Sequence, residues 1–452
     1  CNPVLSPTTG IQAQLPILFA EYTFADKKDI DNYLTLVSQI NDFFNQICEF
    51  QILKAKNNSF LGSETCNLVI KQCISFLAGN KPKDNLFHTS FVSKISNCKF
   101  LSDSEKNNYI NKNLDLINSS VFPGYNKIIS SLKDLQKSGY CKNNKGICHL
   151  KNGKSYYEFL VKNYTGSSKS VLELKSDIQS RLMKDMRTMY SILTVNPELE
   201  NMFYSEEHKS KSPQAILKEL NSKYTDDFPN IGNINYTVKY VDENLQDYLS
   251  PAFFLTPAID DTNNNVIYIN ESDAFSKQDI YTTLAHEGIP GHMYQSAFFL
   301  QTNPLTVRHI LSYGGYTEGW ATYVEFLSYS YEYSDQRLAK ALSCSASYSL
   351  ALYSLCDIGI NYEGWSFKET KDFLKNYNIT GDDICKNIYQ TVINEPANYL
   401  QYYVGYLEIT ALKEKVQKQL GTDFNLKDFH KSFLTIGPAD FKTVEKWIYT
   451  FY

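Results

Sequence analysis

The stretch Leu284-Ala285-His286-Glu287-Gly288-Ile289-Pro290-Gly291-His292-Met293-Tyr294 places two imidazoles and a carboxylate within seven residues. The chain of 452 residues has only seven histidines, so this concentration indicates a metal site. In the pattern H-E-x-x-H, two histidines four residues apart share one helix face and bind zinc, with the glutamate as general base. Here the histidines are six residues apart. An unbroken helix, at about 100° per residue, would put them on roughly opposite sides.

Pro290 and Gly291 lie between the two histidines and favour a break in the helix. Proline disfavours the α conformation at the preceding residue and has no backbone N–H, while glycine adopts dihedrals that other residues avoid. A bulge at this position would return His292 to the face of His286 and complete a metal site. The alternative is a helix that ends at a Pro-Gly turn and carries two surface histidines.

The composition favours long helices and excludes some classes of protein. Tyr and Phe number 34 and 27, against 14 Pro and 20 Gly. With 44 basic and 49 acidic residues and no basic block, the chain lacks the clustered Lys and Arg that nucleic-acid binding needs. No apolar run reaches the roughly 18 residues of a transmembrane helix. We therefore expect neither a nucleic-acid partner nor a membrane span.

The cysteines and the first residues suggest an extracytoplasmic protein. Ten cysteines are more than a cytosolic enzyme usually carries. Cys141 and Cys148 flank a Lys/Asn/Gly loop that suits a disulfide, although connectivity cannot be read from sequence. Cys1 followed by a polar, Pro-containing segment is typical of a mature bacterial lipoprotein, which predicts possible membrane attachment through a lipidated Cys1. An arbitrary boundary is the alternative.

The hydrophobic pattern predicts a mainly α fold. From about residue 19 to 137, apolar residues recur at helical steps, as in Tyr33, Leu36, Val37, Ile40, Phe43, Phe44 and Ile47. The period changes to two in residues 236–241 and 265–270, which predicts two strands separated by 251–261. We expect a large helical bundle enclosing a cleft, with a small β-hairpin or sheet just before the HEGIPGH helix. The expected division is a flexible tether (1–18), an N-terminal helical lobe (19–230) and a zinc-binding catalytic lobe (231–452).

A third metal ligand is expected downstream, because catalytic zinc usually has three protein ligands. The best candidate is Glu318 in the segment EGWATYVE (318–325), 26 residues after His292. Glu325 lies seven residues further on and shares a helix face with Glu318. One carboxylate would bind metal and the other would orient an imidazole. Two solvated glutamates are the alternative, but the apolar neighbours indicate a buried helix, where an unpaired carboxylate is costly.

Together, HEGIPGH (286–292) and EGWATYVE (318–325) resemble the bacterial DUF885 family, all-helical proteins similar to gluzincin-type zinc metallopeptidases. Further matches occur at residues 156–157, 357–360, 364–366, 396–405 and 428–430. The resemblance implies zinc (Zn²⁺) held by His286, His292 and Glu318, with Glu287 as general base. It also implies that Tyr402 reaches the reacting carbonyl.

Three positions depart from the family pattern. Met293 and Asn361 stand where the family often has histidine, and Asn398 where it tends to have glutamine. None removes a proposed ligand. The departures motivate a rival interpretation, a catalytically impaired lipoprotein that binds peptides or other ligands.

The expected function is a zinc-dependent metallopeptidase that hydrolyses peptide bonds, with short peptides as substrates, by Glu287-assisted attack of a zinc-bound water. Tyr402 would stabilise the oxyanion. Asn270, at the end of the second strand, would hold the substrate backbone, with a turn or helix cap as its alternative role. A zinc amidase acting on cell-wall peptides is a further alternative. Arg308, His309 and Tyr313 are assigned structural roles.

Overall fold

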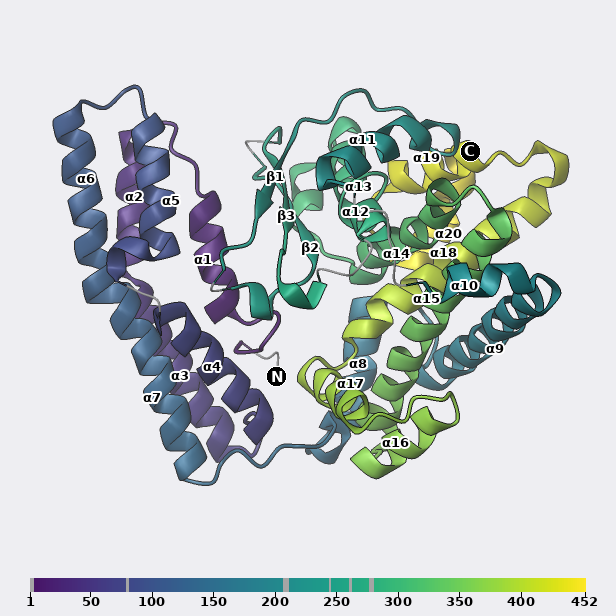
Figure 1. Cartoon of the computed structure of the whole chain (residues 1–452), viewed down its shortest axis with the longest axis horizontal. Coiled ribbons are helices and arrows are strands. Elements are labelled where there is room, and N and C mark those ends of the chain that lie inside the picture. The colour runs from purple at the N-terminus through teal and green to yellow at the C-terminus, as the bar shows by residue number, and fades with distance from the viewer. Residues whose placement is uncertain (1–3, 79–80, 206–210, 244, 260–261, 276–279) are drawn as a thin grey trace. The chain divides into compact units, whose positions relative to one another are not determined.

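The computed structural model describes residues 4–78, 81–205, 211–243, 245–259, 262–275 and 280–452. These residues form helices throughout, with one three-stranded sheet, which confirms the predicted fold class (Figure 1). The contacts divide the chain into two units, residues 1–144 with 242–250 and residues 145–241 with 251–452. This grouping places 145–230 with the second unit, whereas the sequence prediction assigned them to the N-terminal lobe. Cys1 lies outside the described residues.

The first unit is built from seven α-helices among its described residues. They are α1 (Ile11–Glu21), α2 (Lys27–Ser38), α3 (Ile40–Lys56), α4 (Ser63–Ala78), α5 (Leu86–Asn97), α6 (Asp103–Leu116) and α7 (Phe122–Lys137). Capping boxes begin α2 at Asp26 and α6 at Ser102, because each cap side chain and its partner three residues on satisfy backbone N–H groups. Helix α7 packs on α3 and α4.

Two expectations for this part of the chain need correction. The tether predicted over residues 1–18 is too long, because α1 begins at Ile11 and buries Ala13 and Ile17. The nine described cysteines are all free thiols, so Cys141 and Cys148 form no disulfide. The thiol of Cys141 instead lies beside that of Cys66, and each contributes to the pKa shift of the other.

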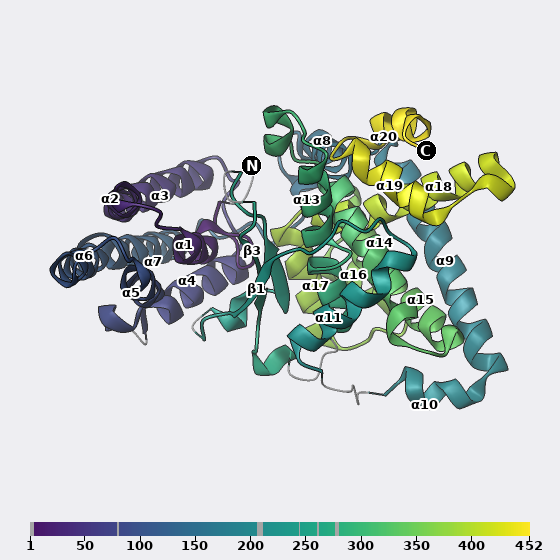
Figure 2. The ribbon, with the colours of Figure 1, turned by 90° about the horizontal axis from the view of Figure 1, so that it is seen from above.

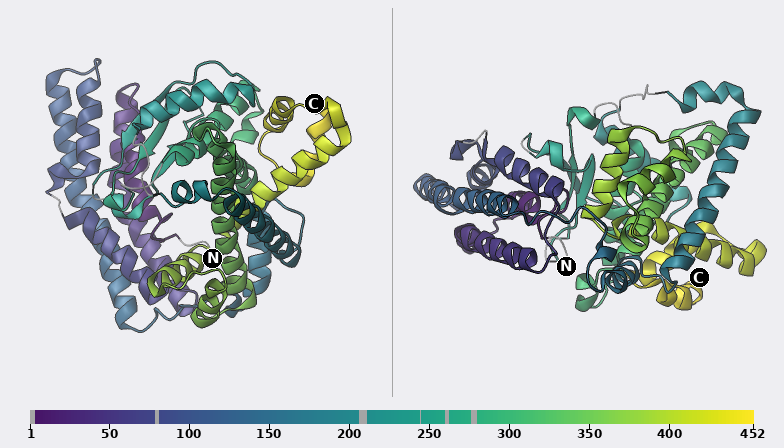
Figure 3. Two further views of the ribbon diagram at one scale, coloured as in Figure 1. Left: turned by 45° about the vertical axis from the view of Figure 1, so that its right-hand side comes forward. Right: turned by 90° about the horizontal axis from the view of Figure 1, so that it is seen from below.

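The second unit contains the remaining helices. They are α8 (Gly153–Thr165), α9 (Val171–Val195), α10 (Glu200–Phe203), α11 (Pro213–Lys223), α12 (Tyr281–Glu287), α13 (His292–Gln301), α14 (Gly314–Glu332), α15 (Gln336–Ile358), α16 (Phe367–Lys375), α17 (Asp382–Asn394), α18 (Asn398–Leu420), α19 (Leu426–Ile436) and α20 (Phe441–Trp447). Helix α9 runs beside α15 (Figures 2 and 3). In the described part of the chain, no helix combines the length and apolar character that crossing a membrane requires.

The sheet of the second unit has the strand order β1-β3-β2. Its strands are β1 (Tyr236–Tyr240), β2 (Ala252–Leu255) and β3 (Asn265–Ile269). Strand β3 pairs in parallel with β1, Tyr236 opposite Asn265, and antiparallel with β2, Phe254 opposite Ile267. The sequence pattern predicted residues 251–261, which include β2, only as the segment that separates two strands. The four apolar residues of β2 are too short a run to show a period, and only pairing with β3 defines them as a strand.

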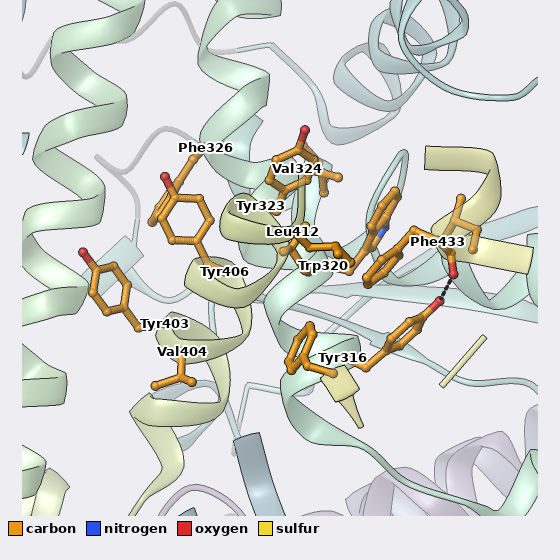
Figure 4. Packing of buried hydrophobic residues seen from close by; sticks show 14 of the residues in the cluster. Tyr316, Trp320, Tyr323, Val324, Phe326, Tyr403, Val404, Tyr406, Leu412 and Phe433 are labelled. Carbon is orange, nitrogen blue, oxygen red and sulfur yellow. Dashed lines mark hydrogen bonds between the residues drawn. The ribbon is translucent and has the colours of Figure 1, made fainter. Parts of the chain in front are cut away.

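Helices α14 and α18 touch backbone to backbone, and this contact sets the position of the candidate site. A Cβ atom on Gly319 would lie 2.4 Å from the carbonyl carbon of Gly405, and one on Gly405 would lie 2.2 Å from the oxygen of Gly315. Large buried side chains fill the space around the crossing (Figure 4). Tyr316 stacks on Phe433 and donates a hydrogen bond to its carbonyl at 3.0 Å.

Candidate metal centre

The helix carrying His286 ends at Glu287, and a new helix begins at His292. Between them, Gly291 adopts φ −81° and ψ −133°, and a Cβ there would lie 1.8 Å from the oxygen of His286. Because of this break, the two imidazole centroids lie 4.8 Å apart with planes at 82°. The Pro-Gly break thus brings the two histidines together, as the metal-site interpretation of the sequence required.

Helix α14 supplies two carboxylates to this histidine pair. Glu325 Oε2 lies 2.9 Å from His286 Nδ1, and Glu318 Oε2 lies 3.7 Å from His286 Nε2. The same Glu318 oxygen is 3.2 Å from His292 Nε2. Trp320, on the same helix, donates a hydrogen bond to the carbonyl of Pro290 at 2.9 Å, so α14 also holds the break that positions His292.

Glu318 offers an oxygen that suits a metal ion. Despite the two nearby imidazoles, its buried Oε2 has no aligned hydrogen-bond partner among the described residues. An unsatisfied buried carboxylate oxygen is costly unless it is paired or binds a metal. Nε2 of His286, Nε2 of His292 and Oε2 of Glu318 form a nitrogen and oxygen donor set that zinc accepts. The residues therefore fit the metal that the sequence predicted.

Glu287 also lies beside the histidines, since His286, Glu287 and His292 offer donor atoms within 4.8 Å of one another. Its Oε2, however, accepts a hydrogen bond from the backbone N–H of Phe254 on β2 at 2.8 Å. A carboxylate held in this way is oriented next to the metal position and is less available as a ligand than Glu318. This geometry agrees with a general base.

The titratable groups of the centre change one another's pKa values. Burial raises the pKa of Glu287, an effect that the neighbouring imidazoles of His286 and His292 partly offset. Burial alone would raise the pKa of Glu318, but the two imidazoles lower it well below its usual range. Burial would lower the pKa of His286, whereas its contacts with Glu318 and Glu325 raise it. The carboxylates of this centre favour the binding of a positively charged ion.

Tyr402 reaches the centre from α18. Its ring lies nearly parallel to that of His286, with centroids 6.2 Å apart and an interplanar angle of 25°. Burial raises the pKa of the phenol well above its usual value, and the carboxylates of Glu318 and Glu287 add to the effect. The phenol therefore keeps its proton at neutral pH and can donate a hydrogen bond.

Asn270 makes the turn contact that was given as its alternative role. It is buried, and its Oδ1 accepts a hydrogen bond from the backbone N–H of Ser272 at 3.0 Å. The structure thus shows the turn-capping role that was its alternative.

The three departures from the family pattern occupy structural positions. Met293 is fully buried in the hydrophobic core. Asn361 is buried too, and its amide joins the side chain of Asp357 at 3.2 Å to the carbonyl of Val392 at 3.1 Å. Asn398 bonds to Glu395 and Gln401 near the start of α18. These contacts give no reason to expect a damaged metal centre.

A pocket of about 430 Å³ adjoins the centre. His292 and Glu318 line it, together with Phe254, Gln295 and Arg308, among others. From the sequence, Arg308 was expected to have a structural role and Gln295 was not among the predicted site residues. The signal for Gln295 was its position three residues after His292, which places both side chains on one face of α13.

A family model described as "Bacterial protein of unknown function (DUF885)" matches residues 3–448. The chain belongs to the DUF885 family. Among solved structures, this DUF885 protein is similar to a predicted lipoprotein from Colwellia psychrerythraea, with a TM-score of 0.85 and 21% identity over 99% of this chain and 80% of that one. A predicted lipoprotein of unknown function from Shewanella oneidensis gives a TM-score of 0.59 and 17% identity over 96% and 81%. No curated protein matches the sequence.

Proposed function

We propose that this DUF885 protein is a zinc-dependent metallopeptidase that hydrolyses short peptides. One observation carries the proposal: the buried Oε2 of Glu318, which has no aligned hydrogen-bond partner among the described residues, lies 3.7 Å and 3.2 Å from the Nε2 atoms of His286 and His292. Two imidazoles and one carboxylate are the protein ligands of several catalytic zinc sites, which keep a fourth position open.

The chain's own groups supply the remaining chemistry. When bound, zinc acts as a Lewis acid that activates water and polarises a carbonyl group. Glu287 takes a proton from the attacking water and delivers it to the leaving amine, a role that its orientation by Phe254 and its raised pKa support. Tyr402 donates a hydrogen bond to the developing oxyanion. Glu325 holds the imidazole of His286 in place through Nδ1.

The position of β2 supports a peptide as the substrate. Strand β2 is an edge strand, because it pairs only with β3 among the described strands. The N–H of Phe254 is directed to Glu287, and the side chain lines the pocket. Edge strands bind extended peptides through main-chain hydrogen bonds. An edge strand next to the general base would align a peptide carbonyl with the centre.

The test combines metal analysis with peptide hydrolysis. We expect about one zinc ion per chain in the wild type and in Glu287→Gln, and hydrolysis of a mixed peptide library by the wild type alone. Glu158→Gln, an exposed carboxylate that accepts a hydrogen bond from Tyr362, serves as the control and should retain activity. A wild-type protein that holds zinc and cleaves no peptide would contradict the proposal and favour a binding protein.

The cell-wall amidase alternative involves the same centre and differs in substrate. Cleavage of peptidoglycan-derived peptides at the bond to the sugar, with no cleavage of ordinary peptides, would favour it. For localisation, the two solved structures named above are described as predicted lipoproteins, which supports a place outside the cytoplasm. Attachment through Cys1 remains a prediction from the sequence.

A further inference from the structure

The pocket beside the metal centre is rich in hydrogen-bond donors. Its volume of about 430 Å³ falls at the small end of ligand pockets, which span about 300 to 1,000 Å³. His292 and Glu318 are among its lining residues, so a ligand in the pocket can reach the centre. Phe299, Leu300 and Leu311 supply apolar wall. The pocket thus has the dimensions and lining of a subsite for part of a small ligand.

Gln295 brings an unused donor to the pocket. The residue is only 5% exposed, and its Nε2 has no hydrogen-bond partner within the described parts of the chain. Buried amide groups in folded proteins are nearly always paired. An unpaired buried amide that lines a pocket next to a candidate active site is explained most simply by a ligand that supplies the acceptor.

Arg308 brings a fixed positive charge. Its Nη2 donates hydrogen bonds to the carbonyls of Ile436 at 2.9 Å and Pro438 at 3.0 Å, and its guanidinium carbon lies 5.5 Å from the ring centre of Phe299. These contacts anchor the guanidinium at the end of α19. Nη2 uses both of its hydrogens on these carbonyls, whereas Nε and Nη1 have no hydrogen-bond partner among the described residues. Each of these two nitrogens can donate a charge-assisted hydrogen bond to one carboxylate oxygen of a ligand.

The charges of the pocket favour an anion. Among the described residues that line it, Glu318 is the only acidic one, and under the proposed function its charge is matched by the metal ion. Arg308 is then the dominant charge of the pocket. A substrate with a basic group here would meet repulsion, whereas a carboxylate would accept hydrogen bonds from both Arg308 and Gln295.

We propose that Arg308 and Gln295 bind the C-terminal carboxylate of the peptide substrate, so that the protein removes short C-terminal fragments. The inference rests on the proposed function, because it places the cleaved carbonyl at the metal centre and the new amine on the pocket side. Apolar side chains near the C-terminus of the substrate peptide would pack against Phe299, Leu300 and Leu311. Hydrolysis consumes one water and releases a free carboxylate and a free amine.

The test measures binding in the zinc-loaded Glu287→Gln protein, where no turnover occurs. Three peptides of one sequence are compared: the free acid, its C-terminal amide, and an amide with a Glu side chain at the last residue. We expect the free acid to bind about 10- to 100-fold more tightly than the simple amide, the contribution of hydrogen bonds to a charged group. Equal affinities would overturn the inference. Preference for the Glu-containing amide over the free acid would overturn the C-terminal assignment.

Substitutions in the pocket test which residues cause the preference for the free-acid peptide. In the same background, Gln295→Leu and Arg308→Lys should each reduce the preference for the free acid about 10-fold, and Arg337→Leu, an exposed control paired with Asp335, should keep it. Gln295→Leu removes a donor without a partner and should not lower the melting temperature, which separates recognition from folding. An unchanged preference in both pocket variants would overturn the inference.

The outcome is independent of the proposed catalysis. If the wild type cleaves no peptide but the inactive protein still prefers the free acid, carboxylate recognition stands and the peptidase proposal fails. If the wild type cleaves free acids and amides equally well, the peptidase proposal stands and carboxylate recognition fails.

Discussion

Nδ1 of His286 lies 2.9 Å from Oε2 of Glu325, which leaves Nε2 of the same imidazole facing Glu318 and His292. A carboxylate on Nδ1 fixes both the ring orientation and the tautomer with a free Nε2, and it makes the imidazole a better ligand. We expect Glu325→Gln to weaken zinc affinity about 10- to 100-fold, measured by competition with a chelator. Glu332→Gln, seven residues further along the same helix, is the control. Equal zinc affinity in wild type and Glu325→Gln would show that this contact is not part of a metal centre.

Gly291→Ala should disrupt the centre. A Cβ at this position would lie 1.8 Å from the oxygen of His286 and 2.4 Å from that of Ala285, so the break between α12 and α13 must shift. We expect a loss of about 2 to 3 kcal/mol in unfolding free energy together with a loss of bound zinc. Gly381→Ala is the matched control, because its Cβ would meet nothing closer than 3.3 Å and its φ is −66°. Urea unfolding and zinc analysis of both variants give the answer, and retention of full zinc by Gly291→Ala would contradict the prediction.

Tyr402→Phe should lower kcat about 100- to 1,000-fold with little change in KM, because the phenol O–H acts on the oxyanion formed in the transition state. The ring contact with His286 is preserved in this variant. Tyr399→Phe removes a phenol one helical turn earlier, where the ring packs on Tyr353, and should leave kcat unchanged. Steady-state kinetics on one peptide distinguish the two. A rise in KM alone would assign Tyr402 to substrate binding.

The buried carboxyl group of Asp357 should make the free energy of unfolding depend on pH. It is buried beneath the start of α18, where it accepts hydrogen bonds from Tyr157 and from the backbone of Ala397. Burial raises its pKa to about 7 from 3.8. Between these values the folded protein keeps a proton that the unfolded chain releases, so stability falls as the pH rises from about 4 to 7 and then levels off.

Asp357→Asn cannot ionise and should lack this component. Between pH 5 and pH 8, the free energy of unfolding of the wild type should fall by about 1 to 3 kcal/mol relative to that of the variant. Urea unfolding midpoints of both proteins across that pH range measure this difference. Other titrating groups affect both proteins equally, so their effect is removed by the comparison. Parallel pH profiles would show that Asp357 is ionised throughout.

The thiols of Cys66 and Cys141 should form a disulfide in an oxidising medium. The two thiols lie side by side, so that each contributes to the pKa shift of the other, whereas the Cys148 thiol donates to the carbonyl of Ile360 at 3.4 Å. Oxidised glutathione, which accepts the two electrons, should link Cys66 to Cys141 in a non-reducing peptide map. The link should stabilise the protein by about 2 to 4 kcal/mol, and Cys141→Ser should abolish the gain while Cys148→Ser retains it. A Cys141–Cys148 peptide in the map would reverse the assignment.

The sequence alone determined what depends on residue type and short-range spacing. Helical periodicity predicted a mainly α fold, because apolar side chains three and four residues apart must lie on one face to be buried. The Pro290-Gly291 pair predicted the break between the histidines, since backbone conformation there depends on these two residues. The same local rule predicted that Glu318 and Glu325, seven apart on one helix, share a face, one as a candidate metal ligand and the other as a supporting carboxylate.

Only the tertiary structure decided what depends on residues distant in the chain. Strand β2 exists because β3 pairs with it, and Phe254 orients Glu287 only through that pairing. The Gly319–Gly405 contact brings α18 onto α14 and Tyr402 next to His286. Arg308 and Gln295 line one pocket because the tertiary fold brings together the segments that carry them. Such juxtapositions result from the packing of whole helices, and no sequence period within a single segment records them.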